Sequence, residues 1–338
     1  MPTIGDVAKA AGVSRSTVSY ALSGNRPISQ ETRDRIDAAI AELGFTVNAG
    51  ARALATSQTM VLALLLRFHE DEFPPAMLQY ILAVSEAALA HGYDTLMVTD
   101  PDGPRALRRV TSSNMVDGVV LLDVTHEDPR LDALRAARQP GALVGLPRDT
   151  EGLDVFDLDF AAAARLLVDH LHELGHRDLI LVVPPRHVFE RGGAYAWRFR
   201  DAALARAEEL GIRVHAYHGA SQQPEVESRL NEILDERPEA TGLIVHNDAS
   251  IAALPAVLRE RGLEVPRDLS VVSLYARDFA RTFLLPYTAV ETSPDRLARD
   301  AVQHLVRRLG HPDAPPVVSL LAPELTLRDS TAVVRPRS

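Results

Sequence analysis

The chain begins with the stretch TIGDVAKAAGVSRSTVSYALSG at residues 3–24, whose pattern is typical of two short helices joined by a tight turn. Thr3 predicts a helix start, because Asp6 stands three residues later, where a capping box has an acid. One helical face then collects the apolar side chains of Ile4, Val7, Ala8 and Ala11. Gly12 is expected to end this first helix.

The next two helices are expected at residues 15–22, capped by Ser14, and at residues 30–43, capped by Ser29. Their inward side chains would be Val18 and Leu22, then Ile36, Ile40 and Leu43. Gly44 stands where a left-handed residue commonly ends a helix. Two short helices joined by an Ala-Gly-Val-Ser turn predict a helix-turn-helix, whose second helix can enter the major groove of DNA.

The second helix leaves Arg15, Ser16, Ser19 and Tyr20 for its outer face or its first turn. Arginine can donate two hydrogen bonds to guanine, and serine or threonine can bond to phosphates or bases. The alternative is that these residues form an ordinary solvated face on a three-helix bundle. The pattern of these helices alone does not decide between the two.

At this point the sequence resembles the LacI/GalR family of transcription regulators. The matching residues are Thr3-Ile4-x-Asp6-Val7-Ala8, Ala11-Gly12-Val13-Ser14, Thr17-Val18-Ser19, Ile28-Ser29-x-x-Thr32-Arg33, Leu43-Gly44-Phe45, Asn48 and Ala51-Arg52-x-Leu54. The resemblance implies that Arg15, Ser16 and Tyr20 read bases. It also implies that residues 48–55 fold into a hinge helix on operator DNA, with Leu54 wedged into the minor groove.

The expected DNA contacts are Thr3, Ser14, Arg15, Ser16, Thr17, Ser19, Tyr20, Asn25, Asn48, Arg52 and Leu54. Gly50 lowers helix propensity, so the hinge is expected to become ordered only on DNA. The alternative interpretation of this segment is a plain linker.

The composition is that of a soluble globular protein, with 46% hydrophobic and 24% charged residues among 338. No apolar run is long enough to span a membrane, and the N-terminus lacks the pattern of a secretory signal. We therefore expect a cytoplasmic, nucleoid-associated protein with no membrane partner. The absence of cysteine excludes disulfides and thiolate chemistry.

The charge is divided unequally along the chain. Residues 1–57 carry six Lys and Arg against five Asp and Glu, a net charge of +1. The remaining 30 basic and 41 acidic residues give −11, so the rest of the chain should be repelled by DNA. A headpiece of such weak charge should bind DNA poorly alone, because neutralising phosphates supplies most of the non-specific affinity. We therefore expect a homodimer, in which two headpieces raise each other's effective concentration.

From residue 60 onward, short apolar runs alternate with amphipathic helices, which predicts doubly wound parallel sheets. The expected strands are 61–66, 95–98, 119–122, 142–144, 179–183, 243–245 and 269–273. The expected helices are 76–90, 105–112, 129–138, 160–174, 195–210 and 249–261. Two such lobes with a cleft between them are similar to a periplasmic-binding-protein clamp.

The family resemblance extends more weakly over this core, through Val116-Asp117-Gly118, His170-Leu171-x-x-Leu174-Gly175-His176-Arg177, Asn247-Asp248 and Val265-Pro266-x-Asp268-Leu269-Ser270-Val271-Val272. The expected α/β architecture is a helix-turn-helix headpiece at 1–47, a hinge at 48–58 and a two-lobed core at 59–338. The N-terminal lobe is expected at about 59–158 plus 289–320, and the C-terminal lobe at about 159–288 plus 321–335.

Two motifs suggest enzymes instead. His172-Glu173-Leu174-Gly175-His176 matches the zinc-protease string H-E-x-x-H, which needs both histidines on one helical face. Gly175 should end the helix first, so we expect no metal site. Asp157 and Asp159 could be paired catalytic acids, but acids so placed more often cap the following helix. No phosphate-binding loop or dinucleotide fingerprint is present, so we expect no catalytic residues and no cofactor.

The resemblance implies a small-molecule effector between the lobes. The expected contacts are Phe73, Asp123, Tyr195, Trp197, Arg198, His246, Asn247 and Tyr275. Asn247 belongs to the family's Asn-Asp pair, and Arg198 is nearest to the place of an effector-binding arginine in relatives. Where relatives have Gly-Phe-Asp-Asp, this chain has Ser273-Leu274-Tyr275-Ala276. That difference removes a carboxylate that grips sugar hydroxyls, and Tyr275 could stack on a sugar ring instead.

These observations predict a dimeric regulator, most simply a repressor, that binds a pseudo-palindromic operator under control of a small molecule. Aromatic and hydrogen-bonding groups in a cleft favour a carbohydrate. The alternative is a sugar-binding protein of the same core fold without a DNA function.

Overall fold

The computed structural model describes residues 2–23, 27–45, 56, 58–68, 74–283 and 286–334. The chain divides into a helical headpiece and an α/β core that begins at Val61, and each is described here by itself. The predicted contacts Asn25, Asn48, Arg52, Leu54 and Phe73 lie outside the described residues, as does most of the expected hinge.

The headpiece contains α1 (Ile4–Ala10), α2 (Arg15–Ser23) and α3 (Gln30–Leu43), which confirms the three predicted helices. The capping box of α1 is present, since the Thr3 hydroxyl accepts from the Asp6 amide at 3.3 Å and Asp6 accepts from the Thr3 amide at 2.8 Å. The hydroxyls of Ser14 and Ser29 cap α2 and α3 by accepting from the amides of Thr17 and Thr32, at 3.1 and 3.3 Å. The three helices meet around the fully buried side chains of Val7, Val18 and Ile36.

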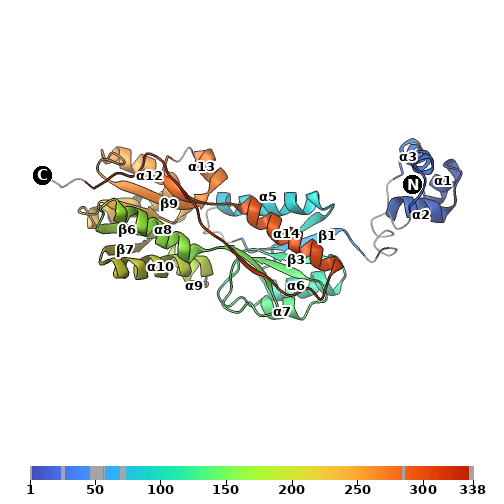
Figure 1. Cartoon of the computed structure of the whole chain (residues 1–338), viewed down its shortest axis with the longest axis horizontal. Coiled ribbons are helices and arrows are strands. Elements are labelled where there is room, and N and C mark those ends of the chain that lie inside the picture. The colour runs from blue at the N-terminus through green and yellow to red at the C-terminus, as the bar shows by residue number, and fades with distance from the viewer. Residues whose placement is uncertain are drawn as a thin grey trace. The chain divides into compact units, whose positions relative to one another are not determined.

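The first lobe of the core is built on a six-stranded parallel sheet in the order β11-β5-β4-β3-β1-β2. Its strands are β1 (Val61–Leu65), β2 (Asp94–Val98), β3 (Gly118–Leu121), β4 (Gly141–Val144), β5 (Asp154–Leu158) and β11 (Val318–Leu321). α5 (Pro74–Ala90) and α14 (Pro294–Gly310) pack side by side on one face (Figure 1). α6 (Gly103–Ser112) and α7 (Leu131–Arg135) pack against each other elsewhere in this lobe.

The second lobe has a six-stranded sheet in the order β12-β10-β9-β8-β6-β7, parallel except for β12. Its strands are β6 (Asp178–Val183), β7 (Arg213–His218), β8 (Gly242–Val245), β9 (Ser270–Ala276), β10 (Thr288–Thr292) and β12 (Leu325–Thr326). Its helices are α8 (Phe160–Glu173), α9 (Arg186–Glu190), α10 (Ala194–Leu210), α11 (Glu225–Glu236), α12 (Asp248–Glu260) and α13 (Arg277–Phe283).

Both faces of the second sheet are buried, because alternate residues of each strand enter different apolar clusters. Along β6, Ile180 and Val182 pack with α11 and α12, while Leu179 and Leu181 pack with α8 and α10. A strand that is buried on both faces is a continuous run of apolar residues, so such strands could be predicted from the sequence. The predicted doubly wound parallel architecture is confirmed.

The structure corrects one expected lobe boundary. Residues 289–292 were expected in the first lobe, but they belong to β10, which pairs in parallel with β9 of the second sheet. The chain crosses between the lobes after β5, after β10 and between β11 and β12. The expected helix at 129–138 is also shorter, being α7. No helix among the described residues is long and apolar enough to span a bilayer.

Candidate functional site

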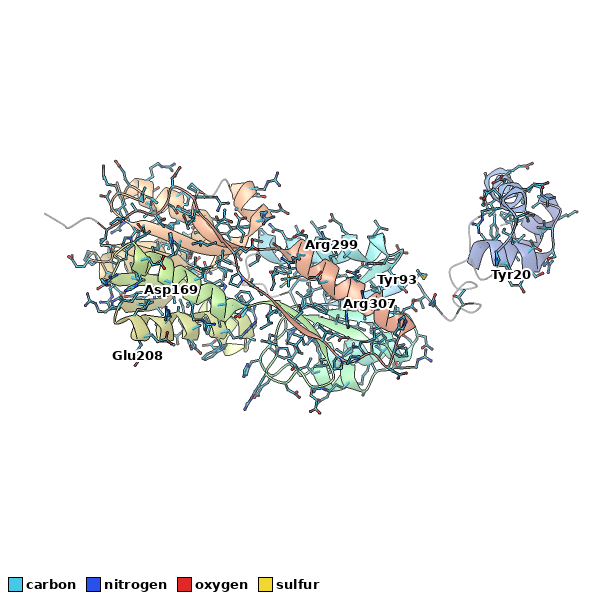
Figure 2. The ribbon with its side chains drawn as sticks, in the orientation of Figure 1. Tyr20, Tyr93, Asp169, Glu208, Arg299 and Arg307 are labelled. Atoms are coloured by element: carbon cyan, nitrogen blue, oxygen red, sulfur yellow. The ribbon has the colours of Figure 1, made fainter. Side chains whose placement is uncertain are left out.

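The outer face of α2 carries the side chains predicted to read DNA. Arg15 and Ser16 are exposed, Tyr20 is 36% exposed, and Val18 on the opposite face is fully buried. Figure 2 shows Tyr20 on the outside of the headpiece. Thr17 and Ser19 are half-buried. A helix with this division of faces can dock in a groove without disturbing its own core.

The start of α2 is organised by local hydrogen bonds among three of the predicted DNA-contact residues. The Ser14 hydroxyl lies 2.7 Å from that of Ser16 and 2.8 Å from that of Thr17. The Arg15 guanidinium lies over α1, and a Cβ atom at Gly5 would come within 2.7 Å of its Nη2 atom. Gly5 therefore leaves room for Arg15, the one cation on α2.

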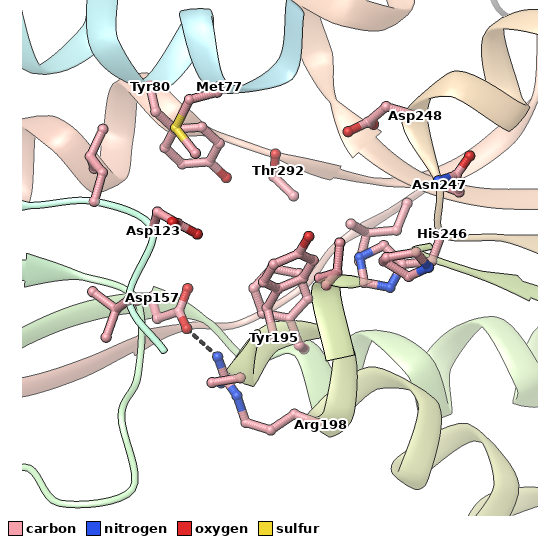
Figure 3. Close-up of a pocket in the computed structure, with 18 of the residues that line it drawn as sticks. Met77, Tyr80, Asp123, Asp157, Tyr195, Arg198, His246, Asn247, Asp248 and Thr292 are labelled. Carbon is pink, nitrogen blue, oxygen red and sulfur yellow. Dashed lines mark hydrogen bonds and ion pairs between the residues drawn. The ribbon is translucent and has the colours of Figure 1, made fainter. Parts of the chain in front are cut away.

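The core holds a cavity of about 220 Å³ lined by residues of both lobes (Figure 3). The lining includes Asp123 after β3, Leu146 after β4, Pro184 after β6 and His246 after β8. All of these positions follow the carboxyl ends of parallel strands, where open α/β sheets bind their ligands. The predicted location of an effector site between the lobes is therefore matched by a cavity.

Two arginine–carboxylate pairs join the lobes across this cavity. Arg198 of α10 donates to Asp157 of β5, and the two side chains are 21% and 8% exposed. Arg191, which follows α9, lies 3.9 Å from Asp123. Burial raises the pKa of Asp157 even though Arg198 and two backbone amides, those of Leu146 and Leu158, oppose the shift. Breaking either pair would leave a desolvated charge in the cleft.

An aromatic cluster forms another wall of the cavity. The His246 ring lies with its centroid 4.3 Å from that of Phe199, 5.6 Å from Tyr195 and 5.8 Å from Phe160. Burial lowers the pKa of His246 to about 3, so the imidazole is neutral at physiological pH. Its Nδ1 atom is buried without a hydrogen-bond partner among the described residues. That nitrogen is a group that a ligand could satisfy.

The remaining polar groups come from the start of α12 and from α5. Asn247 caps α12, because its Oδ1 atom accepts from the Ser250 amide at 2.7 Å. Asp248, the first residue of α12, is partly exposed to the cavity, and burial raises its pKa to about 7. Across the cavity, Tyr80 of the first lobe is hydrogen-bonded to Thr292 of the second.

A buried ion pair supports the loop that carries Asp123. Arg130 is 1% exposed and binds both carboxylate oxygens of Asp128, at 2.9 and 2.7 Å. The same guanidinium donates to the carbonyls of Leu122 and Asp123, each at 2.9 Å. Asp123 has a φ of +50°, a conformation that a non-glycine residue adopts only when its surroundings hold it there. Arg130 supplies that constraint.

The cavity is lined by Asp123, Tyr195, Arg198, His246 and Asn247, all of which were expected there. Trp197 is not part of the lining described. Its ring packs under the Arg200 guanidinium at 4.4 Å and its Nε1 donates to the Phe189 carbonyl, so its expected effector contact is not supported.

Tyr275 borders the cavity, but its expected role as a stacking platform is wrong. Its side chain is 1% exposed, and its hydroxyl donates to the Tyr287 carbonyl at 3.0 Å. Burial raises the pKa of this phenol to about 12. Alternation along β9 turns the ring toward α12 and α13, away from a ligand.

Sequence reasoning missed seven polar lining residues: Tyr80, Asp157, His187, Arg191, Ser221, Asp248 and Thr292. Asp157 had been assigned as a helix cap or a catalytic acid, whereas Asp159 alone caps α8, accepting from the Ala162 amide at 2.9 Å. Asp157 lies near the carboxyl end of β5, and a search for acids at strand ends could have identified it. No local pattern marks Tyr80 or Arg191.

The zinc-protease string has a structural explanation. The His176 ring bonds the Thr241 hydroxyl at 2.9 Å and the Ala332 carbonyl at 3.1 Å, and burial lowers its pKa. Gly175, with φ at +92°, ends α8 before His176 can share a face with His172. Among the described residues no group of three or more His, Asp or Glu is placed to hold a metal ion.

Comparison with known proteins matches both parts of the chain. Residues 3–48 match the model "Bacterial regulatory proteins, lacI family", and residues 168–331 match the model "Periplasmic binding protein-like domain". The HTH-type transcriptional regulator CelR of Thermobifida fusca is 29% identical over 337 residues, covering 97% of this chain and 98% of CelR.

Two solved structures are similar over nearly the whole chain. A complex of transcriptional regulator CelR with cellobiose has 26% sequence identity and a TM-score of 0.66, covering 98% of this chain and 100% of that one. A lac repressor dimer bound to operator and the anti-inducer ONPF has a TM-score of 0.81 at 22% identity, covering 98% and 99%, and shows the fold alone. With an exposed α2 on a helix-turn-helix and a cavity between two core lobes, the chain joins a DNA-binding domain of the lacI family of bacterial regulatory proteins to a periplasmic binding protein-like domain, and like its relatives it is a DNA-binding transcription regulator rather than an enzyme.

Proposed function

We propose that the protein is a homodimeric repressor whose binding to a pseudo-palindromic operator is controlled by an uncharged sugar in the cavity between the core lobes. It would act in the cytoplasm, on the nucleoid. The observation that carries this proposal is that the cavity lining comes from both lobes and includes two ion pairs that join them. A ligand there changes contacts between the lobes, which is what coupling to a second site requires.

The DNA contacts are proposed to come from the headpiece, because the rest of the chain carries a net charge of about −11. Arg15, Ser16 and Tyr20 of α2 would read bases, and Thr3, Ser14, Thr17 and Ser19 would fix the position of the helix. Asn25, Asn48, Arg52 and Leu54 complete the proposed DNA contacts. Residues 48–58 are proposed as the hinge between headpiece and core.

The second copy is proposed to dock on an apolar face of the first lobe. Leu78, Leu82 and Leu89 of α5 are 51%, 52% and 69% exposed, and Met97 on the edge strand β2 is 51% exposed. The three leucines share one side of the helix, because they are spaced by four and seven residues. Large exposed apolar patches of this kind mark protein interfaces. The lac repressor structure similar to this chain is described as a dimer on its operator.

The sugar assignment follows from the chemistry of the lining. Arg191 and Arg198 each face a carboxylate, so the charges of each pair cancel. The lining therefore has no excess positive charge that would bind an anion. Buried Arg198 Nε and His246 Nδ1 have no hydrogen-bond partner among the described residues, and Tyr195 and Phe160 offer ring faces. Hydroxyl groups on a ring with an apolar face satisfy both kinds of surface. The CelR structure similar to this chain contains cellobiose.

The test begins by selecting operator sequences from random duplex DNA with the full-length protein. Fluorescence anisotropy then measures the affinity for the selected duplex with and without each member of a panel of mono- and disaccharides. We expect one sugar to change the operator affinity by about 5- to 150-fold. The same factor must appear in the sugar's affinity when DNA is present. A sugar that binds without any change in operator affinity would contradict the coupling.

A further inference from the structure

Gly5 lies in the first turn of α1, where the backbone does not require a glycine. In the described part of the headpiece, Gly12 and Gly44 have a positive φ and Gly5 does not. A glycine inside a helix is less favourable than an alanine, because its backbone loses more conformational freedom on folding. The absent side chain is therefore explained by what occupies its place.

The guanidinium of Arg15 occupies that place. A Cβ atom at Gly5 would lie 2.7 Å from its Nη2, 2.8 Å from its Nε and 3.0 Å from its Cζ. Apart from the chain neighbours of Gly5 and the backbone of its own helix, no heavy atom would come closer. Non-bonded heavy atoms prefer separations of about 3.5–4.0 Å, so an alanine at this position would push the guanidinium away by about 1 Å.

The core of the headpiece fixes the distance between Gly5 and the backbone of Arg15. α1 and α2 pack together around Val7 and Val18, both of which are fully buried. Arg15 is the first residue of α2, and the hydroxyl of Ser14 caps the start of that helix. The side chain of Arg15 therefore reaches α1 from a rigid base and lies against its bare backbone.

The charge of Asp6 supports this placement. Its carboxylate accepts hydrogen bonds from the amide and the hydroxyl of Thr3, each at 2.8 Å. These hydrogen bonds lower the pKa of Asp6, and the charges of Lys9 and Arg15 lower it further. The carboxylate is therefore ionised at neutral pH, and it attracts the guanidinium that lies against the preceding residue.

We propose that Gly5 is a specificity-determining residue of the DNA-binding helices, because its bare backbone fixes the point from which the Arg15 guanidinium approaches a base. The inference rests on the proposed base reading by Arg15 and adds a positioning residue that acts through it. Arginine reads guanine by donating to O6 and N7 at the same time. Such hydrogen bonds span only about 2.7–3.2 Å, so a displacement of about 1 Å breaks at least one of them.

The experiment measures base-pair preferences of the full-length protein. An operator is first selected from random duplex DNA, and fluorescence anisotropy then gives the affinity for it and for each of its single base-pair variants. The substitutions are Gly5→Ala, Arg15→Ala and both together. The matched control is Gly310→Ala at the end of α14, where a Cβ atom would meet nothing within 4 Å. Hydrogen exchange read by mass spectrometry reports whether α1 and α2 stay folded, and Gly5→Ser serves if Gly5→Ala does not.

Arg15→Ala should identify the base pair that Arg15 reads, by removing a preference of about 5- to 150-fold there. Gly5→Ala should lower the preference at the same base pair by about 5- to 10-fold, as expected for the loss of one hydrogen bond. Amide protection in α1 should stay the same or rise, because alanine favours a helix. In the Arg15→Ala background Gly5→Ala should change no preference, and Gly310→Ala should match the parent.

An unchanged or sharper preference in folded Gly5→Ala and Gly5→Ser overturns the role of Gly5 and leaves base reading by Arg15 standing. An equal loss from Gly5→Ala with and without the Arg15 side chain assigns the effect to α1 itself and overturns the inference as well. If Arg15→Ala weakens all operator variants uniformly, base reading by Arg15 fails and the positioning role of Gly5 fails with it.

Discussion

Replacing Asp248 by asparagine should make the core more stable at pH 8, although the substitution removes a charge from the start of a helix. Burial raises the pKa of this carboxyl from 3.8 to about 7. The folded state therefore holds the proton more tightly than the unfolded state does. The stability contributed by the protonated acid is fully present below about pH 4 and is lost progressively as the pH rises to about 7, so the full penalty applies at pH 8.

The size of the effect follows from that shift. Each pKa unit corresponds to about 1.4 kcal/mol, so a shift of roughly three units costs at most about 4 kcal/mol above pH 7. The positive end of α12 stabilises the ionised carboxylate by about 0.3–1 kcal/mol. Burying the asparagine amide also costs some free energy, which reduces the gain from the substitution. We therefore expect Asp248→Asn to raise the free energy of unfolding by about 2–3 kcal/mol at pH 8 and by about 1 kcal/mol or less at pH 5, where only about a third of the penalty is present.

The assay is urea unfolding of the ligand-free protein at pH 5 and pH 8, followed by fluorescence. Trp197 is the single tryptophan and lies on α10 of the lobe that contains Asp248, so its emission reports on that lobe. Asp295→Asn serves as the surface control and should stay within about 0.5 kcal/mol of the parent at both pH values. Equal stability of Asp248→Asn and the parent at pH 8, or an equal gain at pH 5, would refute the claim that burial of the charge is costly.

Three further substitutions test other parts of the molecule. Arg15→Ala should weaken operator binding by about 1–3 kcal/mol and relax preference at one base pair; a uniform loss across operator variants, measured by anisotropy, contradicts base reading. Arg130→Met should destabilise the core by about 3–5 kcal/mol in urea because it strands Asp128, whereas adding Asp128→Leu should recover most of this loss. Leu82→Glu should convert the dimer to monomers in analytical ultracentrifugation, while Leu327→Glu, at a residue 67% exposed, should not; a dimeric Leu82→Glu protein would place the interface elsewhere.

The headpiece could be predicted from the sequence almost residue by residue, because its helix ends are decided locally. The predicted third helix at residues 30–43 coincides with α3, since Ser29 caps its start and Gly44 takes the left-handed conformation at its end. Caps and C-terminal glycines act within a few residues of the chain, so a linear pattern contains the whole signal. The buried strands were predicted for a similar reason, as continuous apolar runs.

One element that sequence reasoning missed, β5, depends for its burial on distant residues. β5 has the sequence Asp-Val-Phe-Asp-Leu, and two acids in five residues argue against a buried strand. Asp154 is nevertheless 2% exposed because Arg308, 154 residues away, binds it, with one contact at 2.8 Å. Arg198 neutralises Asp157 from 41 residues away. The residues next to Asp154 and Asp157 in the sequence do not indicate which arginine binds each acid.

The sequence by itself determined that this is a helix-turn-helix regulator with a two-lobed α/β core, because capping, periodicity and family motifs are local and repeat along the chain. Only the tertiary structure decided the composition of the cavity between the lobes. It turned Tyr275 into the core and moved Trp197 out of the lining, and it left Asp248 as the one cavity acid without a partner among the described residues. The physical reason is that a side chain's role in a cleft depends on which charges and rings of both lobes surround it, and folding alone brings those groups together.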